Sequence, residues 1–211
     1  NATSFRWDFG NETYSVERTP SPLYEAAGNF NIKLLAMHQI GCRDSITVEN
    51  ITIHPLPEVA ISRDTLICHG DAALLSASGG VDYKWSPEQM ILQPHSAVTA
   101  ASPDESTWFV VQVTDENGCV NYNGTMVTVQ QRPFVNLSDT TLIIGESFQI
   151  KLSDESIASY QWSPDEHISC SNCPNPLFTA METTTYSVAV TDVSNCFTLN
   201  YPLTITVQKI Y

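Results

Sequence analysis

An internal repeat with a period of about 77 residues constrains the fold of this 211-residue chain more than any other feature. Three segments place an aromatic residue two positions before a tryptophan, and these tryptophans are Trp7, Trp85 and Trp162. Downstream of each tryptophan, a turn-like sequence ends in a cysteine, and these are Cys42, Cys119 and Cys196. Independent landmarks that share one period indicate three copies of one structural unit in tandem.

Proline-containing segments mark the boundaries between the copies. Pro55-Leu56-Pro57 and Pro133 each follow a strand-like pattern, where proline is typical of a short, stiff linker. We therefore expect domains at residues 1–57, 58–132 and 133–211. Only six residues precede Trp7, against about 26 before the other two tryptophans within their copies. The first domain is therefore expected to lack its first strands, and the chain to be part of a longer polypeptide.

The apolar residues alternate with polar ones, which is the period of a β-strand with one face in a core. Phe109, Val111 and Val113 show this alternation, and so do Tyr186 and Val188 in the next copy. Valine, isoleucine, threonine and aromatic residues dominate these runs, and turns rich in glycine, proline, asparagine and aspartate separate them. The pattern predicts an all-β protein, built as tandem β-sandwich domains in a linear array.

The composition excludes several classes of function. Nine lysines and arginines stand against 23 aspartates and glutamates, which gives a formal net charge of −14. Nucleic-acid binding needs a basic face, so no nucleic-acid partner is expected. No apolar run approaches the roughly 20 residues of a membrane span, so direct membrane insertion is not expected either. The sequence contains no GxSxG, no HExxH and no phosphate-binding glycine loop, and we expect a protein that is not an enzyme.

Four tryptophans are candidates for structural or binding roles. Trp7, Trp85 and Trp162 recur at the repeat period, which predicts a place in the core of each domain. Trp108 has no such counterpart, because Thr185 stands at its position in the third copy. It is also out of phase with Phe109, which predicts an outward-facing indole. Such an indole suits an edge or interdomain contact, or stacking on a sugar ring.

The six cysteines predict disulfides and hence an oxidising, extracellular location. Cys68 and Cys119 fall in one copy, and a bridge between them would pin its two sheets together. The bridge would close a loop of about 50 residues, which corresponds to roughly 4 kcal/mol in the chain-entropy model. The position of Cys68 aligns with about Ile144 in the third copy, so Cys196 is left without that partner, and Cys42 lacks one too.

Two further cysteines lie close together in the third copy. Cys170 and Cys173 are separated by two residues, and a local disulfide in a loop is the expected arrangement. The alternative is a zinc site, because His167, Cys170 and Cys173 have the spacing of metal ligands and Cys196 could be the fourth.

Adjacent acidic residues are the remaining candidates for a site. They are found at Asp104-Glu105, Asp115-Glu116, Asp154-Glu155 and Asp165-Glu166. Neighbouring carboxylates in turns usually point apart, so a solubilising acidic surface is the expected role. The alternative is Ca²⁺ held between domains, because Ca²⁺ takes six to eight oxygen ligands, although no DxDxDG loop is present. No other cofactor is expected.

The first copy resembles the polycystic-kidney-disease (PKD) domain. WDFG begins at Trp7, and the segment that follows matches the family pattern through these residues: Pro22, Tyr24, Gly28, Phe30, Ile32 and Leu34. The resemblance implies a PKD-like β-sandwich over residues 1–57. The usual aspartate-glycine after WDFG is Asn11-Glu12 here, a small departure in a turn.

The second and third copies resemble the immunoglobulin-like repeats of large cell-surface adhesins of gliding Bacteroidetes. The shared features are TLICxG from Thr65, WSP at Trp85 and Trp162, SCSNCPNP from Ser169 and TTTYSVAVTD from Thr183. In that family such repeats precede a gliding-motility-associated C-terminal region exported by the type IX secretion system, and residues 206–211 resemble the junction before that region. The absence of a cysteine near Ile144 departs from the family pattern.

The resemblance implies a non-enzymatic, extracellular stalk or adhesin segment at the cell surface. Its expected partners are neighbouring domains of a longer polypeptide, surface glycans or other cell-surface proteins. The alternative is a carbohydrate-binding accessory module of a secreted polysaccharide-degrading enzyme, for which Trp108 is the supporting residue.

Overall fold

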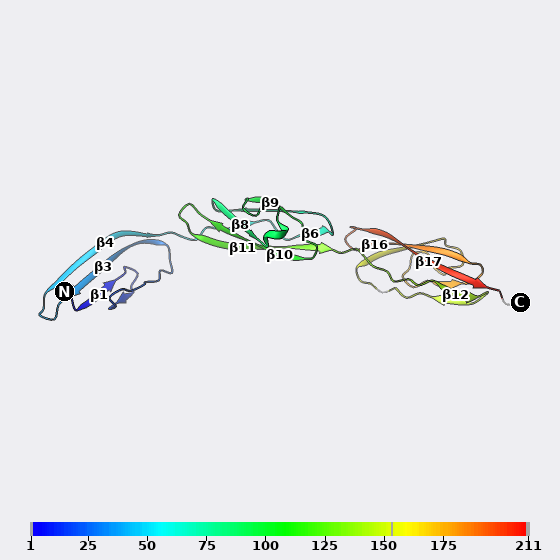
Figure 1. Cartoon of the computed structure of the whole chain (residues 1–211), viewed down its shortest axis with the longest axis horizontal. Helices are drawn as coiled ribbons and strands as arrows, with labels where there is room; N and C mark the ends of the chain where they lie inside the picture. Colours follow the sequence, from blue (N-terminus) through cyan, green and yellow to red (C-terminus); the bar gives the residue numbers. More distant parts are fainter. Residues whose placement is uncertain (1, 153, 210–211) are drawn as a thin grey trace.

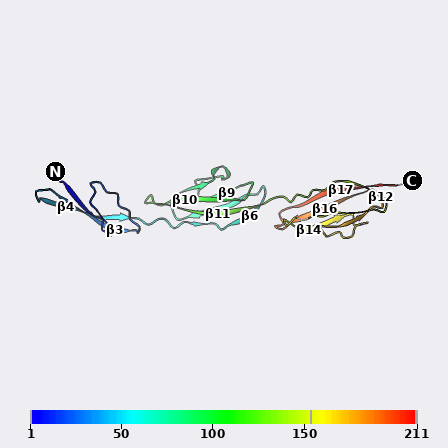
Figure 2. The same cartoon turned by 90° about the horizontal axis from the view of Figure 1, so that it is seen from below.

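The computed structural model describes residues 2–152 and 154–209 of the chain. Its strands form three groups that follow one another along an extended line, with the two ends of the chain far apart (Figure 1). The same linear arrangement is seen when the molecule is turned by 90° (Figure 2). We refer to the groups as the N-terminal unit (β1 to β4), the middle unit (β5 to β11) and the C-terminal unit (β12 to β17).

The N-terminal unit is a single four-stranded sheet. The sheet has the strand order β2-β1-β3-β4, with β4 at one edge. The strands are β1 (Ser4–Asp8), β2 (Tyr14–Ser15), β3 (Gly28–Met37) and β4 (Arg43–Ile53). All three pairings are antiparallel. No second sheet covers this one in the described residues, so Ile46 and Val48 of β4 stay exposed.

The middle unit is a two-sheet sandwich. A four-stranded sheet with the order β6-β11-β10-β8 faces a three-stranded sheet with the order β5-β7-β9. Apolar residues from both sheets, among them Leu75, Phe109, Val111 and Val127, form one buried cluster. The elements are β5 (Ala60–Ile61), β6 (Thr65–Cys68), β7 (Ala73–Ser78), β8 (Asp82–Ser86), the 3₁₀ turn η1 (Glu88–Met90), β9 (Val98–Ala101), β10 (Thr107–Thr114) and β11 (Val120–Gln130).

The C-terminal unit repeats this plan with a smaller second sheet. The larger sheet has the order β12-β17-β16-β14, and the smaller one pairs β13 with β15. Phe178, Tyr186, Val188 and Leu203 are fully or almost fully buried in its core. The strands are β12 (Thr140–Ile143), β13 (Ser147–Gln149), β14 (Ile157–Ser163), β15 (Leu177–Thr179), β16 (Thr184–Asp192) and β17 (Thr198–Gln208).

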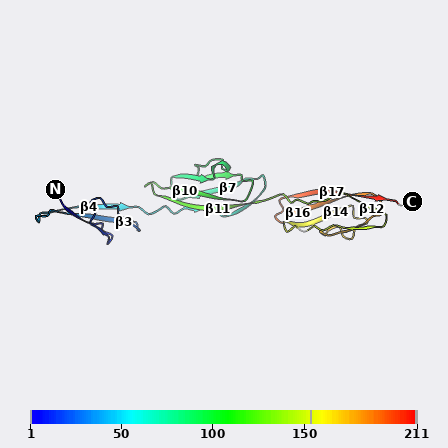
Figure 3. The ribbon, with the colours of Figure 1, turned by 60° about the horizontal axis from the view of Figure 1, so that its bottom comes forward.

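The prediction of an all-β protein made of tandem domains in a linear array is confirmed for the fold, and the middle and C-terminal units are the predicted sandwiches. The sandwich expected over residues 1–57 is not found in the described residues, where the N-terminal unit is a single sheet. The view in Figure 3, turned by 60°, shows the middle and C-terminal units as separate layered bodies along one line. The sequence repeat corresponds to a repeated topology, because the strands of the larger sheet follow the same order in the middle and C-terminal units. In each, a short strand runs parallel to the last strand at the sheet edge: β6 beside β11, and β12 beside β17. The N-terminal unit has no such strand beside β4 within the described residues.

The three repeated tryptophans occupy equivalent places but are not equally buried. Trp85 and Trp162 are 0 % and 1 % exposed in their cores. Each indole N–H donates to a carbonyl oxygen eleven residues later, Ser96 and Cys173 respectively. Trp7 makes the corresponding bond to the carbonyl of Glu17, but its side chain is only half-buried, so its prediction as a core residue was wrong in degree. The reason is that one sheet alone cannot enclose an indole.

No helix in the described part of the chain is long and apolar enough to cross a membrane. The last two residues of the ending that resembles a secretion-region junction, Ile210 and Tyr211, lie outside the described residues.

Candidate functional site: a disulfide-linked junction between units

The middle and C-terminal units are joined by a disulfide bond. The bond links Cys68, the last residue of β6, to Cys196 in the turn between β16 and β17. Their Cα atoms lie 5.4 Å apart, and the two residues are separated by 128 positions in the sequence. The sequence-based prediction of a Cys68–Cys119 bridge is therefore wrong, and Cys119 carries a free thiol that is partly buried.

The position of β6 explains why Cys68 cannot reach Cys119. Strand β6 pairs in parallel with the last residues of β11, so that Cys68 lies opposite Gln130. Cys119 precedes the first residue of β11, Val120. At about 3.3 Å per residue, the length of β11 puts roughly 35 Å between the two cysteines. The Cα atoms of a disulfide lie no more than about 7 Å apart, so the bridge within the unit is excluded.

Further contacts surround the bond between the units. The hydroxyl of Ser194, in the β16–β17 turn, donates to Oε1 of Gln130 at the end of β11, at 2.9 Å. The guanidinium of Arg132, in the linker, lies 5.3 Å from the ring centroid of Phe197, which is a cation–π distance. The hydroxyl of Tyr201 donates to the carbonyl of Pro133. The C-terminal unit thus contacts the linker at two residues, and the junction has covalent, polar and aromatic contacts in one place.

The carboxylate of Asp192 shapes the turn that presents Cys196. Asp192 is completely buried at the end of β16. Its Oδ1 accepts the backbone N–H of Ser194 at 2.8 Å and that of Cys196 at 3.3 Å, and its Oδ2 accepts that of Phe197. A buried carboxylate is costly unless it is hydrogen-bonded, and here three donors from its own turn satisfy it.

These hydrogen bonds change the acidity of Asp192. Burial raises the pKa of the carboxyl, but the backbone N–H groups of Phe197, Ser194 and Cys196 favour the ionised form and outweigh it. The net effect is a pKa below the ordinary value of an aspartate. A depressed pKa means that the ionised form stabilises the folded state at neutral pH, and that this contribution is lost as the pH falls.

We expect the C-terminal unit to lose stability as the pH falls from about 5 through the lowered pKa of Asp192. In the variant Asp192→Asn, the melting temperature should be lower than that of the parent at pH 7, and the difference should shrink towards pH 2. Melting curves followed by circular dichroism between pH 2 and pH 7 measure this. Glu116→Gln, an exposed acidic residue in the corresponding turn of the middle unit, is the control and should leave the pH profile unchanged. A constant offset between Asp192→Asn and the parent at every pH would contradict the assignment.

The turns that precede Cys42, Cys119 and Cys196 share one geometry. In the middle unit, Asp115 takes the place of Asp192, and its carboxylate accepts the N–H of Cys119 at 2.8 Å. In each turn the residue just before the cysteine has a positive φ, and these residues are Gly41, Gly118 and Asn195. Its N–H also donates to the carbonyl three residues earlier, which belongs to His38, Asp115 and Asp192 respectively. The sequence period of Cys42, Cys119 and Cys196 therefore reflects one repeated turn that presents a cysteine.

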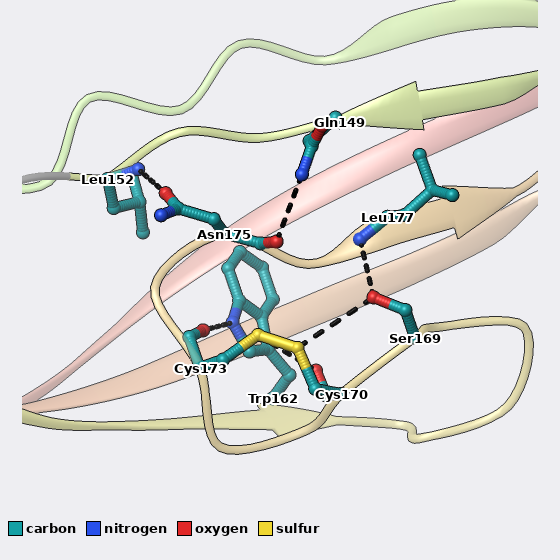
Figure 4. The surroundings of a disulfide bond; sticks show 8 residues. All are labelled: Gln149, Leu152, Trp162, Ser169, Cys170, Cys173, Asn175 and Leu177. Carbon is teal, nitrogen blue, oxygen red and sulfur yellow. Dashed lines mark hydrogen bonds between the residues drawn. A yellow bond between two sulfur atoms is a disulfide. The ribbon is translucent and has the colours of Figure 1, made fainter.

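The second disulfide closes a loop over the end of the C-terminal sandwich. Cys170 and Cys173 are bonded to each other, with their Cα atoms 5.9 Å apart, as the sequence suggested. Figure 4 shows the bond beside the indole of Trp162, whose N–H donates to the carbonyl of Cys173 at 3.0 Å. The side chain of Asn175 accepts the N–H of Leu152 from the facing segment, also seen in Figure 4. The loop is a structural clamp on the core.

The bonding of these sulfurs removes the ligands of the zinc alternative. A structural zinc site needs thiolates, and Cys170, Cys173 and Cys196 all have their sulfurs in disulfides. The acidic pairs gather no cation site either: in residues 2–152 and 154–209, no group of three or more His, Cys, Asp or Glu side chains is suitably placed for a metal ion. Asp115 and Asp154 use their carboxylates to accept N–H groups of their own turns.

Trp108 faces outward, in agreement with its phase on the strand, and its side chain is 51 % exposed. The indole lies over Gly124 of the neighbouring strand β11, where an added Cβ would approach the ring to 2.5 Å. The pairing of β10 with β11 puts Val110, Gln112 and Tyr122 on the same face of the sheet. Tyr122 is exposed, and its hydroxyl donates to Gln112. The outer face of the middle unit therefore carries two exposed aromatic residues.

The junction residues were not predicted from the sequence. Gln130, Ser194 and Arg132 form contacts across the junction, which a search within one repeat does not detect, and Asp192 supports them by ordering the turn of Ser194 and Cys196. One signal was available, because the sequence Thr-Asp-x-x-x-Cys occurs in both turns, at Thr114 and Thr191. An aspartate four residues before a cysteine in two copies indicates that the aspartate orients the cysteine.

Comparisons with known proteins support the fold only. No protein-family model matches the sequence, and no curated protein matches it. Among solved structures, the two-domain IG1+IG2 fragment of DIP-gamma aligns with 73 % of this chain and 98 % of its own, with a TM-score of 0.52 and 12 % identity. The insect immune protein hemolin aligns with 97 % of this chain and 67 % of its own, with a TM-score of 0.43 and 10 % identity. The similarity to DIP-gamma shows a tandem immunoglobulin-like fold.

Proposed function

We propose that this chain is a stiff, non-enzymatic segment of an extracellular cell-surface adhesin, in which sandwich domains hold a binding region away from the cell. The observation that carries the proposal is the disulfide between Cys68 and Cys196, because it joins two units that have separate hydrophobic cores. A bond of this kind limits the angle between domains. Disulfides persist in oxidising environments, which favours an extracellular location.

The remaining surface is suited to such a segment. A net charge of −14 favours solubility and opposes association between neighbouring stalks in a crowded layer. The sequence resemblance makes the surface repeats of gliding Bacteroidetes our proposed family, with a PKD-like first domain at residues 1–57 and immunoglobulin-like domains at 58–132 and 133–211. Export by the type IX secretion system and a role in gliding are parts of the same proposal, and the partners are neighbouring domains and other cell-surface molecules.

A protease-protection experiment on intact cells tests the location and the role together. We expect proteinase K added to intact cells to remove the protein, while a cytoplasmic marker stays intact. Cells that produce the protein without its middle and C-terminal units should attach less to a solid surface, although the shortened protein remains on the cell. Protection of the protein in intact cells would contradict the proposal, and so would unchanged attachment of the shortened protein.

A carbohydrate-binding role is the second candidate, and the outer face of the middle unit favours it. Trp108 and Tyr122 are exposed on one sheet face, with Gln112 beside them. Their strand positions differ by four residues, which is about 13 Å along the sheet. Exposed aromatic rings on one face suit a polysaccharide chain, since each can stack on a sugar ring while the polar groups bind its hydroxyls.

We expect Trp108→Ala to lower retention on insoluble polysaccharides at least tenfold if this face binds sugar, because one stacking ring is lost. Pull-down on a panel of insoluble glycans measures retention. Tyr14→Ala is the control, since Tyr14 is a similarly exposed aromatic residue in the N-terminal unit. Equal retention of both variants and the parent would remove the carbohydrate-binding candidate and leave the adhesin proposal intact.

A further inference from the structure

The N-terminal unit has an open sheet edge at a position that is filled in the other two units. In the middle unit β6 runs parallel to the end of β11, and in the C-terminal unit β12 runs parallel to the end of β17. The strand of the N-terminal unit that corresponds to β11 and β17 is β4, which pairs only with β3 in the described residues. Such an edge presents unpaired N–H and C=O groups and is a template for an added strand.

The strand register identifies the residues of this edge. Phe30 lies opposite Ile51 in the N-terminal unit, as Thr107 lies opposite Val127 in the middle unit. Because Val127 pairs with the first residue of β6 and Gln130 with its last, Cys68, the equivalent edge runs from Ile51 to His54. An added strand in the same register would therefore place its last residue opposite His54.

The end of the middle unit next to the N-terminal unit carries a free thiol. Cys119 occupies the turn whose counterpart presents Cys196 to Cys68, and its sulfur is unbonded. Figure 1 shows the β10–β11 turn at the end of the middle unit that faces the N-terminal unit, just as the β16–β17 turn faces the middle unit. The side chain of Asn121, the second residue of β11, donates to the carbonyl of Pro57 at 2.9 Å, so the segment just after β4 contacts the strand that follows that turn. Partial burial raises the pKa of Asp115, but the N–H groups of Cys119 and Asn117 and the charge of His54 lower it overall.

We propose that the β4 edge and Cys119 together form a docking site for an extended strand that runs parallel to β4 and ends in a cysteine, which bonds to Cys119. The model for the occupant is β6 itself, Thr-Leu-Ile-Cys, with its cysteine at the C-terminal end. In the other units this strand comes before the tryptophan strand in sequence, so the source is a polypeptide segment N-terminal to β1. A second copy of this chain is not the source, because its β6 is already paired and its Cys68 is bonded.

Two observations that do not depend on each other meet in this site. The open edge follows from strand pairing, and the free cysteine follows from the repeated turn.

The chemistry of the bond is ordinary disulfide formation. In the cell, the two thiols lose two protons and two electrons to the disulfide of a dithiol oxidant, which is reduced to its dithiol. In the test below, the Cys119 thiolate attacks a mixed disulfide on a peptide. One S–S bond then forms, one breaks, and the leaving thiolate departs with the electron pair, so no net oxidation is needed.

A synthetic peptide with the sequence of residues 62–69 tests the site on the full chain. Its cysteine is activated as a mixed disulfide with thionitrobenzoate, whose release is followed by absorbance. In the variant Cys42→Ser, which leaves Cys119 as the free thiol, we expect a reaction at least tenfold faster than with an activated peptide of scrambled sequence. N-methylation of the peptide backbone at the leucine and isoleucine should abolish this difference, since it removes the donors of the strand ladder. In the variant Cys119→Ser, Cys42 should react with both peptides at one rate.

Three results would overturn the proposal. Equal rates for the strand and scrambled peptides would show that no strand docks. A disulfide-linked dimer through Cys119, formed without peptide, would identify a second copy as the partner and refute the proposed source. In protein isolated from its own cells, peptide mapping without reduction should find Cys119 bonded to a peptide outside residues 1–211. A free Cys119 there would also refute it.

Discussion

Replacing Cys68 or Cys196 by serine should lower the free energy of unfolding of the paired middle and C-terminal units by about 5 kcal/mol. The bond closes a loop of 128 residues, and the chain-entropy model assigns about that value to a loop of this length. For two units of this size the melting temperature should fall by roughly 10–20 °C. The angle between the units should also become variable, because only the linker and side-chain contacts remain.

Thermal unfolding and small-angle scattering measure the two effects. Cys119→Ser is the matched control, since Cys119 lies in an equivalent turn but has a free thiol in this chain. That control should keep the melting temperature and the maximum dimension of the parent. If Cys68→Ser left both quantities unchanged, the bond would not restrict the junction, and the stiff-segment proposal would lose its support.

Truncating Trp85 to alanine should cost about 3–5 kcal/mol, the range for deleting a fully buried aromatic side chain. Trp85 is completely buried and also donates a hydrogen bond to Ser96 across the unit. That loss is comparable to the whole stability of a small domain, so the middle unit should be largely unfolded near 37 °C. Trp162→Ala should act similarly on the C-terminal unit, whereas Trp7→Ala should cost only about 1–2 kcal/mol, because less of its surface is buried.

Urea unfolding followed by tryptophan fluorescence and circular dichroism separates these cases. Trp85→Phe is the conservative control, since it keeps most of the apolar volume and loses the N–H donor. It should recover at least half of the lost stability. Equal losses for Trp7→Ala and Trp85→Ala would contradict the conclusion that a single sheet encloses its tryptophan poorly.

The strands and their repetition were predictable because they depend on local patterns. Alternation of apolar and polar residues identified the buried faces of β10 and β16, and Val111 and Val188 are indeed fully buried. The outward direction of Trp108 followed from the same alternation. The disulfide between Cys170 and Cys173 was also accessible, because two intervening residues keep the cysteines within reach of each other.

The pairing of Cys68 was not predictable from one repeat, because the sequence of a short edge strand does not show which part of the neighbouring strand it pairs with. A strand at residues 65–68 beside the start of β11 would have placed Cys68 near Cys119. Strand β6 instead pairs with residues 127–130, at the end of β11 that faces the next unit. The lowered pKa of Asp192 was not predicted for a related reason, since the burial of this side chain and its hydrogen bonds depend on the fold around the turn.

The Cys68–Cys196 bond has a mechanical consequence for a chain pulled from its two ends. Tension enters β6, crosses the sulfur atoms and leaves through β17, so the residues between the two cysteines stay out of the load path even when their domains unfold. A separation of 128 residues corresponds to roughly 450 Å of chain that force alone cannot extend. A reductant releases that length, so the redox state of one bond decides how far this part of the protein can stretch.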